Sequence, residues 1–557
     1  MTATGDQFKG FVHSAGGQLV DGEGQPLLLR GVGLGNWLLP EGYMWKFEHP
    51  RTQSPREIEA LIQDLVGTDL ATEFWERFRA TFMTEDDIAR IHAEGMNHVR
   101  LPINSRVVLD DSGELNEPGF ALIDKAIDWC RKHHLWVVLD LHGAPGGQTG
   151  TNIDDSPHQA PELFTDERYR TLTVKLWVAL AERYRDETVV AAYDLLNEPL
   201  PNEYQHLYAR QLRDLYRDLT SAIRDVDRNH MISYEGTHWA TNWDVFTEVW
   251  DPNSILQFHK YWSPPDRPSI QGYIDVGRDL GLPIYMGEGG ENNLDWIQTA
   301  FQLYDDCGIS WNFWTWKKID TLTSPCSVNP PLAWIEVTDY AAGRGVKPDR
   351  ARAYQTLTEL LDAMPLARCA YRSEIVSALL RRPPLRIPAF GFGFRGAGES
   401  YKSSAAAPMD AFRSDDLVTI RRSNGKEDGV LDWNRTDSLV RAAGNELLVS
   451  VGAGDWVAYE FVVQSTSRVQ IVVALQSASG ATHPDPALEI TVDGESLGAE
   501  DPDESSLRGM TRQLSAGSHI LRLTGLLSDT FVRWIEIMPV SGRYAMRERE
   551  EGFTSIR

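Results

Sequence analysis

Short apolar runs of strand length alternate with longer amphipathic segments over the first part of the chain. Eight of these runs are almost continuously apolar, which is typical of strands that helices cover on the outside. We predict strands at residues 28–32, 97–101, 135–141, 189–196, 231–234, 254–258, 282–286 and 309–314. Eight such strands predict a (β/α)₈ barrel. A doubly wound sheet is the alternative, but the glycine-rich phosphate loop expected after its first strand is missing.

Amphipathic segments of helix length separate most of these strands. The clearest helix start is at Thr84, a capping residue that three acidic residues follow in the first predicted turn. We predict helices at residues 55–65, 84–94, 120–132, 166–184, 204–226, 294–304 and 350–361. The insertion at 33–82 is rich in aromatic residues, which suits the wall of a closed pocket better than an open cleft.

The pattern changes after the last of these helices. Residues 8–365 form the predicted barrel domain, and residues 366–408 form a predicted linker or edge segment rich in Pro, Gly, Ala and Ser. Residues 409–541 alternate between apolar and polar positions in strand-length runs without helix signals. We therefore predict an α/β chain in which a TIM barrel is followed by an all-β sandwich of the jelly-roll type.

Composition narrows the class of partner. The chain has 54 Lys and Arg against 80 Asp and Glu, a net charge of −26, so it repels nucleic acids and anionic membranes and suits an uncharged substrate. No apolar run is long enough to span a bilayer, and no signal peptide is visible, so we expect a cytoplasmic protein, or a secreted one if the printed start is not native. The four cysteines match no zinc pattern; we expect buried thiols, with a Cys326–Cys369 bridge as the alternative.

Two carboxylates stand at the ends of two predicted strands. Glu198 follows the apolar run at 189–196 and precedes a proline that stops the strand, and Glu288 follows the run at 282–286 and precedes two glycines. Further polar or aromatic side chains stand at other strand ends: Arg100, His142, Asn197, His259 and Trp314. Because the strand C-termini of a barrel meet at one face, these side chains are expected together. A carboxylate pair of this kind is typical of glycoside hydrolysis.

Seven stretches carry a resemblance to a known family, and each falls on or beside a predicted strand. The stretches are residues 29–38, 98–102, 140–148, 196–199, 259–262, 287–288 and 311–317. Each is weak alone, but together, in this order, they resemble glycoside hydrolase family 5, and most closely its exo-β-1,3-glucanase-like branch. The resemblance implies a retaining enzyme on a (β/α)₈ barrel that needs no organic cofactor and no catalytic metal.

The resemblance also assigns roles to matched residues. Glu198 corresponds to the acid/base and Glu288 to the nucleophile of a double displacement, which requires carboxyl groups about 5–5.5 Å apart. Arg100 and Tyr261 would hold the nucleophile Glu288. Asn197 would bond the 2-hydroxyl of the sugar, and His142 and His259 would line the same subsite. Trp314 would lie beneath the sugar ring, with Trp316 on the same face of the strand. Each also has a structural interpretation, as a loop anchor, an ion-pair partner or a core side chain.

Exo action requires a blocked end of the pocket, and here the sequence departs from the family. Glu41 falls where the resembling branch places a glutamate that binds the terminal sugar. In that branch its polar partner follows the third strand. The loop here differs in length, so Asn152, Asp154 or Asp155 is the candidate partner, and the preference for glucose depends on this contact.

The C-terminal sandwich resembles carbohydrate-binding modules of the family 6 and 35 type. The resemblance is carried by residues 454–460, 516–523 and 534–537. These are core-strand residues, so they support the fold more than ligand binding, and a sandwich that only buttresses the barrel is an equal alternative. Such modules often carry a structural calcium ion, although no ligand set for one stands out in the sequence.

These features predict a retaining, exo-acting β-glycosidase whose partner is a carbohydrate, with β-glucosides such as β-1,3-glucan or its oligosaccharides as the first choice. Mannosides, galactofuranosides, arabinofuranosides, rutinosides and glucosylated lipids are alternative substrates of the same mechanism. A non-catalytic glycan-binding protein is the alternative from another class, but a lectin needs neither Glu198 nor Glu288. The sequence leaves the oligomeric state open.

Overall fold

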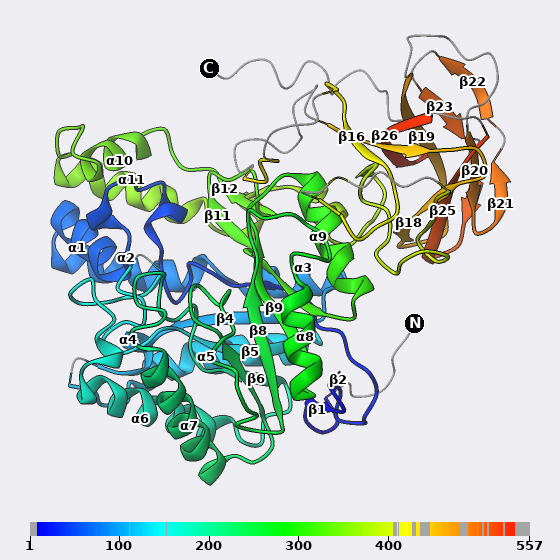
Figure 1. Ribbon diagram of the computed structural model, residues 1–557. Coiled ribbons are helices and arrows are strands. Elements are labelled where there is room, and N and C mark those ends of the chain that lie inside the picture. Colours follow the sequence, from blue (N-terminus) through cyan, green and yellow to red (C-terminus); the bar gives the residue numbers. More distant parts are fainter. Residues whose placement is uncertain are drawn as a thin grey trace.

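A computed structural model describes most of the chain. The described residues are 8–110, 112–151, 153–404, 409, 412–425, 431–434, 446–477, 488–497, 499–503, 506–509, 512–526 and 530–540. Figure 1 shows two parts, a barrel surrounded by helices and a smaller part built from strands. None of the helices in the described ranges is both long and apolar enough to cross a bilayer.

Eight parallel strands close into the barrel, and the last of them pairs with the first. In chain order the barrel strands are β3 (Arg30–Gly33), β4 (His98–Asn104), β5 (Trp136–Gly143), β6 (Val190–Asp194), β7 (Met231–Glu235), β8 (Ser254–His259), β9 (Ile284–Gly290) and β10 (Ser310–Trp314). Nearly every residue in these strands is buried, because one side faces the barrel interior and the other faces helices. The barrel and all eight predicted strands are confirmed.

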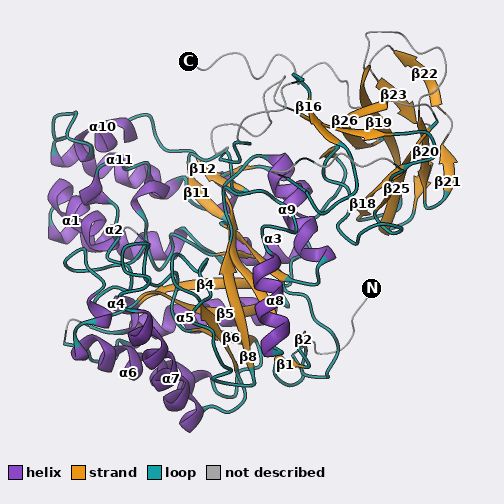
Figure 2. Ribbon diagram, in the orientation of Figure 1, coloured by secondary structure: helices purple, strands orange, loops and turns teal. Residues whose placement is uncertain are grey.

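Helices cover the outside of the barrel (Figure 2). They are α3 (Glu85–Ala93), α4 (Ser105–Val108), α5 (Glu117–Lys132), η3 (Glu162–Phe164), α6 (Glu167–Tyr184), α7 (Ala209–Val226), α8 (Gln271–Leu280), α9 (Leu294–Asp306), α10 (Trp334–Ala341) and α11 (Arg350–Asp362). Thr84 and Asp87 form a capping box at the start of α3, as predicted. The sequence does not predict α8, in which two glycines lower the helix propensity. A short hairpin of β1 (His13–Ala15) and β2 (Gln18–Val20) precedes the barrel.

The insertion between β3 and α3 folds around an aromatic core. It contains η1 (Gly42–Trp45), η2 (Pro50–Thr52), α1 (Pro55–Val66) and α2 (Thr68–Thr81), of which the sequence predicts only α1. The ring of Trp45 lies 5.1–6.3 Å from the rings of Phe74, Phe78 and Trp334. Most aromatic residues of this insertion therefore form a core, and the expectation that they line a pocket holds only for Tyr43.

Two antiparallel sheets form the C-terminal part, in agreement with the predicted sandwich. The first contains β14 (Leu385–Pro388), β16 (Ile420–Arg422), β17 (Leu447–Val451), β19 (Ser467–Ser477), β22 (Ala499–Asp503), β23 (Ser506–Gly509), β24 (Arg512–Leu514) and β26 (Thr530–Pro539). The second contains β15 (Tyr401–Lys402), β18 (Trp456–Val463), β20 (Leu488–Val492), β21 (Glu495–Leu497) and β25 (Gly517–Gly525). Fully and partly buried positions alternate along β18 and β25, because only one face of each strand points into the core.

The described part of the predicted linker or edge segment, residues 366–404, is folded. Its first half contains η4 (Leu366–Arg368), β13 (Ala370–Tyr371) and α12 (Ser373–Leu379), and β13 joins a small sheet with β11 (Lys317–Ile319) and β12 (Cys326–Val328). Its second half supplies β14 and β15 to the sandwich. Ile375 and Ile387 are fully buried, so apolar side chains hidden among the Pro and Gly residues fold this segment.

The four cysteines are free thiols. Cys130 and Cys326 are buried, and Cys307 and Cys369 are partly exposed. Burial raises the pKa of the Cys307 and Cys369 thiols to about 11, so both stay protonated and weakly nucleophilic at neutral pH. The alternative of a Cys326–Cys369 bridge is not realised.

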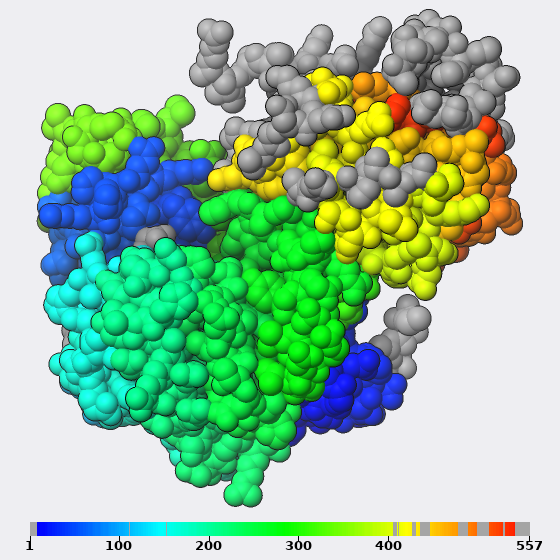
Figure 3. All heavy atoms as spheres, viewed as in Figure 1, coloured from blue at the N-terminus to red at the C-terminus, as the bar shows by residue number. Residues whose placement is uncertain are grey.

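The sandwich packs against one side of the barrel, as the contact between the yellow and green segments in Figure 3 shows. Arg381 pairs with Asp305 and Arg395 with Asp306, both at 2.9 Å, at the end of α9. The Arg381–Asp305 pair is almost completely buried. Losing one partner of such a pair would leave an uncompensated buried charge, so this interface contributes to stability.

Two further contacts connect this side of the sandwich to loops at the C-terminal end of the barrel. The backbone N–H of Arg413 donates to Asp266, in the loop after β8, at 2.9 Å. Asn292, in the loop after β9, donates from its side chain to the carbonyl oxygen of Trp433. Both loops also contribute residues to a pocket of about 990 Å³, so the sandwich touches the segments that shape this pocket.

Candidate active site

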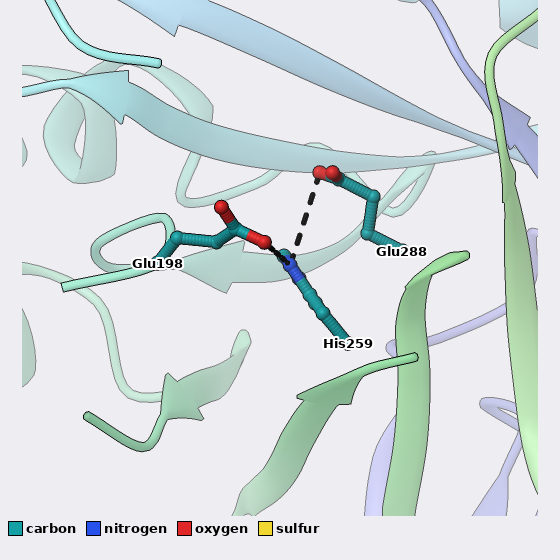
Figure 4. Close-up of side chains that lie close together, drawn as sticks. All are labelled: Glu198, His259 and Glu288. Carbon is teal, nitrogen blue, oxygen red and sulfur yellow. Dashed lines mark hydrogen bonds and ion pairs between the residues drawn. The ribbon is translucent and has the colours of Figure 1, made fainter. Parts of the chain in front are cut away.

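Two carboxylates and a histidine meet at the C-terminal end of the barrel (Figure 4). Glu198 follows β6, His259 ends β8, and Glu288 lies within β9. Nδ1 of His259 lies 2.7 Å from Oε1 of Glu198 and 4.0 Å from Oε2 of Glu288. One oxygen of Glu198 lies within 4.8 Å of one oxygen of Glu288. The structure therefore brings together the two carboxylates that the sequence predicts as a pair.

Glu288 is held by two donors. Nη1 of Arg100 donates to its Oε2 at 2.8 Å, and the hydroxyl of Tyr261 donates to its Oε1 at 2.7 Å. Burial raises the pKa of Glu288, while the charges of His259 and Arg100 oppose this rise and favour the carboxylate. Arg100 and Tyr261 are the two residues that the sequence analysis expects to hold Glu288.

Arg100, on β4, is fully buried at the centre of a set of acidic residues. It donates to Asp194 on β6 at 2.9 Å and to Glu235 on β7 at 3.0 Å, and Asp140 on β5 lies 3.2 Å away. It also donates to Oδ1 of Asn197 at 2.8 Å. Several carboxylates buried together repel one another, so this guanidinium is the charge that allows them to share the barrel interior.

His142, on β5, is neutral and has one defined tautomer. Its Nδ1 lies 2.7 Å from Oδ2 of Asp140, and its Nε2 lies 3.3 Å from Nδ2 of Asn197. Because Oδ1 of Asn197 accepts from Arg100, Nδ2 must be the donor, so the proton of His142 is on Nδ1. Burial lowers the pKa of His142 to about 4, in agreement with a neutral ring. The ring stacks on that of Trp314 with centroids 5.4 Å apart, so the two form one wall.

This wall belongs to a pocket of about 990 Å³. Glu41, Tyr43, Glu198, Tyr261 and Glu288 line it as well. The lining residues that the sequence does not predict are Met44, Lys46, Ile153, Trp239, Trp262, Glu291 and residues 318–323. Trp262 is 51% exposed and its ring lies 5.6 Å from that of Tyr261, so it presents an open aromatic face on which a sugar ring can stack.

Glu41 lies almost completely buried in this pocket. Its Oε1 lies 4.0 Å from Nε2 of His142 and has no hydrogen-bond partner within the described part of the chain. Burial raises the pKa of Glu41, and the charges of Glu288 and Glu291 add to the rise. A buried acceptor without a partner is suited to bind a sugar hydroxyl, which is the role that the sequence predicts for it.

Five predicted sugar contacts are absent from the pocket lining: Asn197, His259, Asp154, Asp155 and Trp316. Asn197 bonds to Arg100 and His142, and His259 bonds to Glu198, so both support residues of the site. Both oxygens of Asp154 accept backbone N–H groups of its own loop, so this side chain holds the loop in shape. Trp316 is fully buried and donates to Asp87 at 3.0 Å. β10 ends at Trp314, so the alternation of strand faces does not extend to Trp316. Asn152 lies outside the described residues.

The sequence analysis misses three buried acids around the centre of the site, Asp140, Asp194 and Glu235. The signals were present, because Asp140 and Asp194 interrupt apolar strands and Glu235 follows an apolar run, as Glu198 does. Burial raises the pKa of Asp140 to about 8, so this group keeps a proton near neutral pH. Burial acts in the same direction on Glu235, but the charges of His259 and Arg100 and the hydrogen bonds that Glu235 accepts together outweigh it and lower the pKa of Glu235. The site therefore contains both protonated and ionised acids.

The two carboxylates and His259 are near enough to one another to hold a cation, but their atoms are already engaged. Both oxygens of Glu288 accept hydrogen bonds, from Arg100 and Tyr261, and Oε1 of Glu198 is bonded to His259. A cation would have to displace a buried guanidinium, so we propose no metal in this site.

Comparison with known proteins finds glycoside hydrolases that are similar to this chain. Residues 63–320 match the family model described as cellulase, glycosyl hydrolase family 5. A beta-xylosidase of Phanerodontia chrysosporium is 28% identical over 348 residues, which are 56% of this chain and 71% of that protein. A probable glucan 1,3-beta-glucosidase A of Aspergillus fumigatus is 31% identical over 264 residues, which are 46% of this chain and 62% of that protein. Among solved structures, endoglucanase Cel5A of Thermotoga maritima is 20% identical with a TM-score of 0.40, covering 63% of this chain and 96% of that one.

Proposed function

We propose that this chain is a member of glycoside hydrolase family 5, whose family model matches residues 63–320, and that it hydrolyses β-glycosidic bonds with retention of the anomeric configuration. The observation that carries the proposal is the pair of Glu198 and Glu288, which have oxygens within 4.8 Å of each other. Retaining glycosidases hold their carboxyl groups about 5–5.5 Å apart and inverting ones about 6.5–9.5 Å apart. The short separation favours direct attack by a carboxylate over attack by a water placed between the two groups.

The site residues divide the work of a double displacement. In the first step Glu288 attacks the anomeric carbon while Glu198 gives its proton to the leaving oxygen. In the second step Glu198 takes a proton from a water, which attacks the anomeric carbon and releases Glu288. Arg100 and Tyr261 hold Glu288 as a carboxylate aimed at the sugar, since both of its oxygens accept their hydrogen bonds.

A β-glucoside is the proposed substrate, cleaved from the chain end. Two observations support it: one relative is a probable glucan 1,3-beta-glucosidase, and Glu41 has an unpaired acceptor in the pocket. A β-xyloside is the second candidate, because another relative is named a beta-xylosidase and xylose differs from glucose only in lacking the C6 hydroxymethyl group. No organic cofactor is part of either proposal.

The test is a panel of 4-nitrophenyl glycosides that carry β-glucose, β-xylose, β-mannose, β-galactofuranose or rutinose. We expect turnover of the β-glucoside above all others, and proton NMR of the first product should show the β-anomer. Turnover of another sugar would keep the mechanism and change the substrate. An α-anomer as the first product would contradict the retaining mechanism, and the absence of any turnover would contradict the proposed activity.

Replacing Glu41 by glutamine is expected to lower kcat/KM for the preferred glycoside by about 2- to 10-fold, since a hydrogen bond between neutral groups contributes about 0.5–1.5 kcal/mol and burial favours the neutral form of Glu41. The control is Glu48→Gln in the same insertion, whose side chain is 68% exposed and outside the pocket. Steady-state kinetics of both variants measure the difference. Equal kcat/KM values for the two variants would show that Glu41 does not bind the sugar.

A further inference from the structure

Glu235 has no part in the double displacement as described, yet it reaches Glu198 by two routes. It lies at the end of β7 and is fully buried. Its Oε2 accepts the backbone N–H of Glu198 at 2.6 Å. Its Oε1 lies 3.3 Å from Nε2 of His259, whose Nδ1 contacts the Glu198 carboxylate at 2.7 Å. One carboxylate is thus bound to both the backbone and the side-chain partner of the proposed acid/base.

The first route supports an unusual backbone conformation. Glu198 has a φ of 44°, in the left-handed region that residues other than glycine seldom adopt. Pro199 follows it, and a proline further restricts the conformation of the residue before it. Local preferences therefore oppose the conformation that places this side chain in the pocket. The charge-assisted bond from the Glu198 N–H to Glu235 is a contact that opposes this tendency.

The second route acts on the charge of His259. With Nδ1 donating to Glu198, Nε2 has two neighbours, Oε1 of Glu235 at 3.3 Å and Nε2 of Gln257 at 3.0 Å. Both N–H groups of the Gln257 amide are already used, in hydrogen bonds to Asp194 and Glu235. A proton on Nε2 of His259 is therefore directed to Glu235, and the negative charge of Glu235 favours the charged ring.

Charged and titratable groups from the neighbouring strands complete the surroundings of this pair. They are Arg100 on β4, Asp140 and His142 on β5, Asp194 and Glu198 at the end of β6, and Glu288 on β9. Burial alone would lower the pKa of His259, but Glu235 and Glu288 outweigh it and raise that pKa well above the usual value. Arg100 contacts Glu235 at 3.0 Å and keeps it ionised.

We propose that Glu235 is a positioning residue for proton transfer by Glu198, because it fixes the backbone of Glu198 and keeps His259 as a charged donor to Oε1. With Oε1 engaged by His259, Oε2 of Glu198 is the oxygen that exchanges the proton with the leaving group and then with water. Glu235 touches no substrate in this scheme. The kinetic part of this inference rests on the proposed glycosidase function.

The kinetic test compares Glu235→Gln with the wild type on two β-glucosides of different leaving groups. Phenolate needs a proton to leave and 2,4-dinitrophenolate does not, so kcat/KM should fall about 100-fold or more for the phenyl glucoside and less than tenfold for the dinitrophenyl glucoside. The matched control is Asp194→Asn, which also removes a buried carboxylate bonded to Arg100 and Gln257. Asp194 has no hydrogen bond to Glu198 or His259 in the described structure, so its loss should be similar for both glucosides.

A second readout needs no turnover. With ¹⁵N-labelled histidine, the His259 signals, identified by their loss in His259→Asn, should stay those of a charged ring to a higher pH in the wild type than in Glu235→Gln. Glu235→Asp, which keeps the charge, should restore the wild-type titration. Identical titrations in wild type and Glu235→Gln, or equal losses on both glucosides, would overturn the proposal. If the wild type hydrolyses neither glucoside, the proposed function fails, and the titration still decides whether Glu235 controls His259.

Discussion

Replacing Glu288 by glutamine is expected to lower kcat for the preferred aryl glycoside by at least about 10⁴-fold while the protein stays folded. An amide has the shape of the carboxylate but cannot attack the anomeric carbon. It can still accept the hydrogen bond of Tyr261, and Arg100 keeps its contacts to Asp194 and Glu235. Steady-state kinetics and thermal unfolding of the same samples measure the two effects separately.

Glu291 provides the control for this experiment, because its side chain also lines the pocket, is only 12% exposed and pairs with Lys318. Glu291→Gln should cost far less activity than Glu288→Gln. A 2-deoxy-2-fluoro glycoside with a dinitrophenolate leaving group should label the wild type covalently, and peptide mass spectrometry should find the label on Glu288. A label on Glu291 would show that Glu291, and not Glu288, is the nucleophile.

Replacing Arg100 by methionine is expected to abolish turnover and to destabilise the barrel by about 3–5 kcal/mol. The guanidinium is fully buried and contacts Asp140, Asp194, Glu235 and Glu288 at 2.8–3.2 Å. Without it the ionised acids among them lose their main counter-charge and repel one another inside the barrel. Urea unfolding followed by tryptophan fluorescence should therefore show the barrel transition at a clearly lower urea concentration.

The matched control for Arg100 is Arg30→Met on the neighbouring strand. Arg30 also makes a 2.8 Å ion pair, with Asp305, but its side chain is 38% exposed. Asp305 keeps a second partner in Arg381, so this substitution should cost less than about 1 kcal/mol. If the Arg100→Met and Arg30→Met variants unfolded at the same urea concentration, the result would contradict the idea that the buried acids depend on Arg100.

The strands of the barrel are predictable because their sequence signal is local. A run such as 135–141 is apolar on both faces, and the structure shows that both faces are covered. The insertion is less predictable, since α2 has a polar composition and is held by contacts of Phe74 and Phe78 to the ring of Trp45. The ring of Trp45 in turn packs on that of Trp334, far away in the sequence. Contacts between segments that are far apart in sequence are not visible to pattern analysis.

The residues of the candidate active site are also predictable only in part. The rule that strand-end polar residues meet at one face brings Glu198, Glu288 and Arg100 together. Applied without exception, the rule would also have selected Glu235, which follows an apolar run but belongs to no stretch that carries the family resemblance. Asp154 and Trp316 fail for a different reason. Their roles depend on the course of the chain after a strand ends, and sequence spacing does not determine that course.

The contacts between sandwich and barrel have a consequence for synthesis of the chain. Asp266 and Asn292 stand in the loops that border the pocket, but their partners Arg413 and Trp433 come 147 and 141 residues later. Chains grow from the N-terminus and early domains fold first, so the barrel can form while the partners of these loops are still unmade. A ribosome-bound chain that has completed its eight barrel strands therefore still lacks two contacts of the loops that border the pocket, and these contacts can form only after residues 413 and 433 have been added.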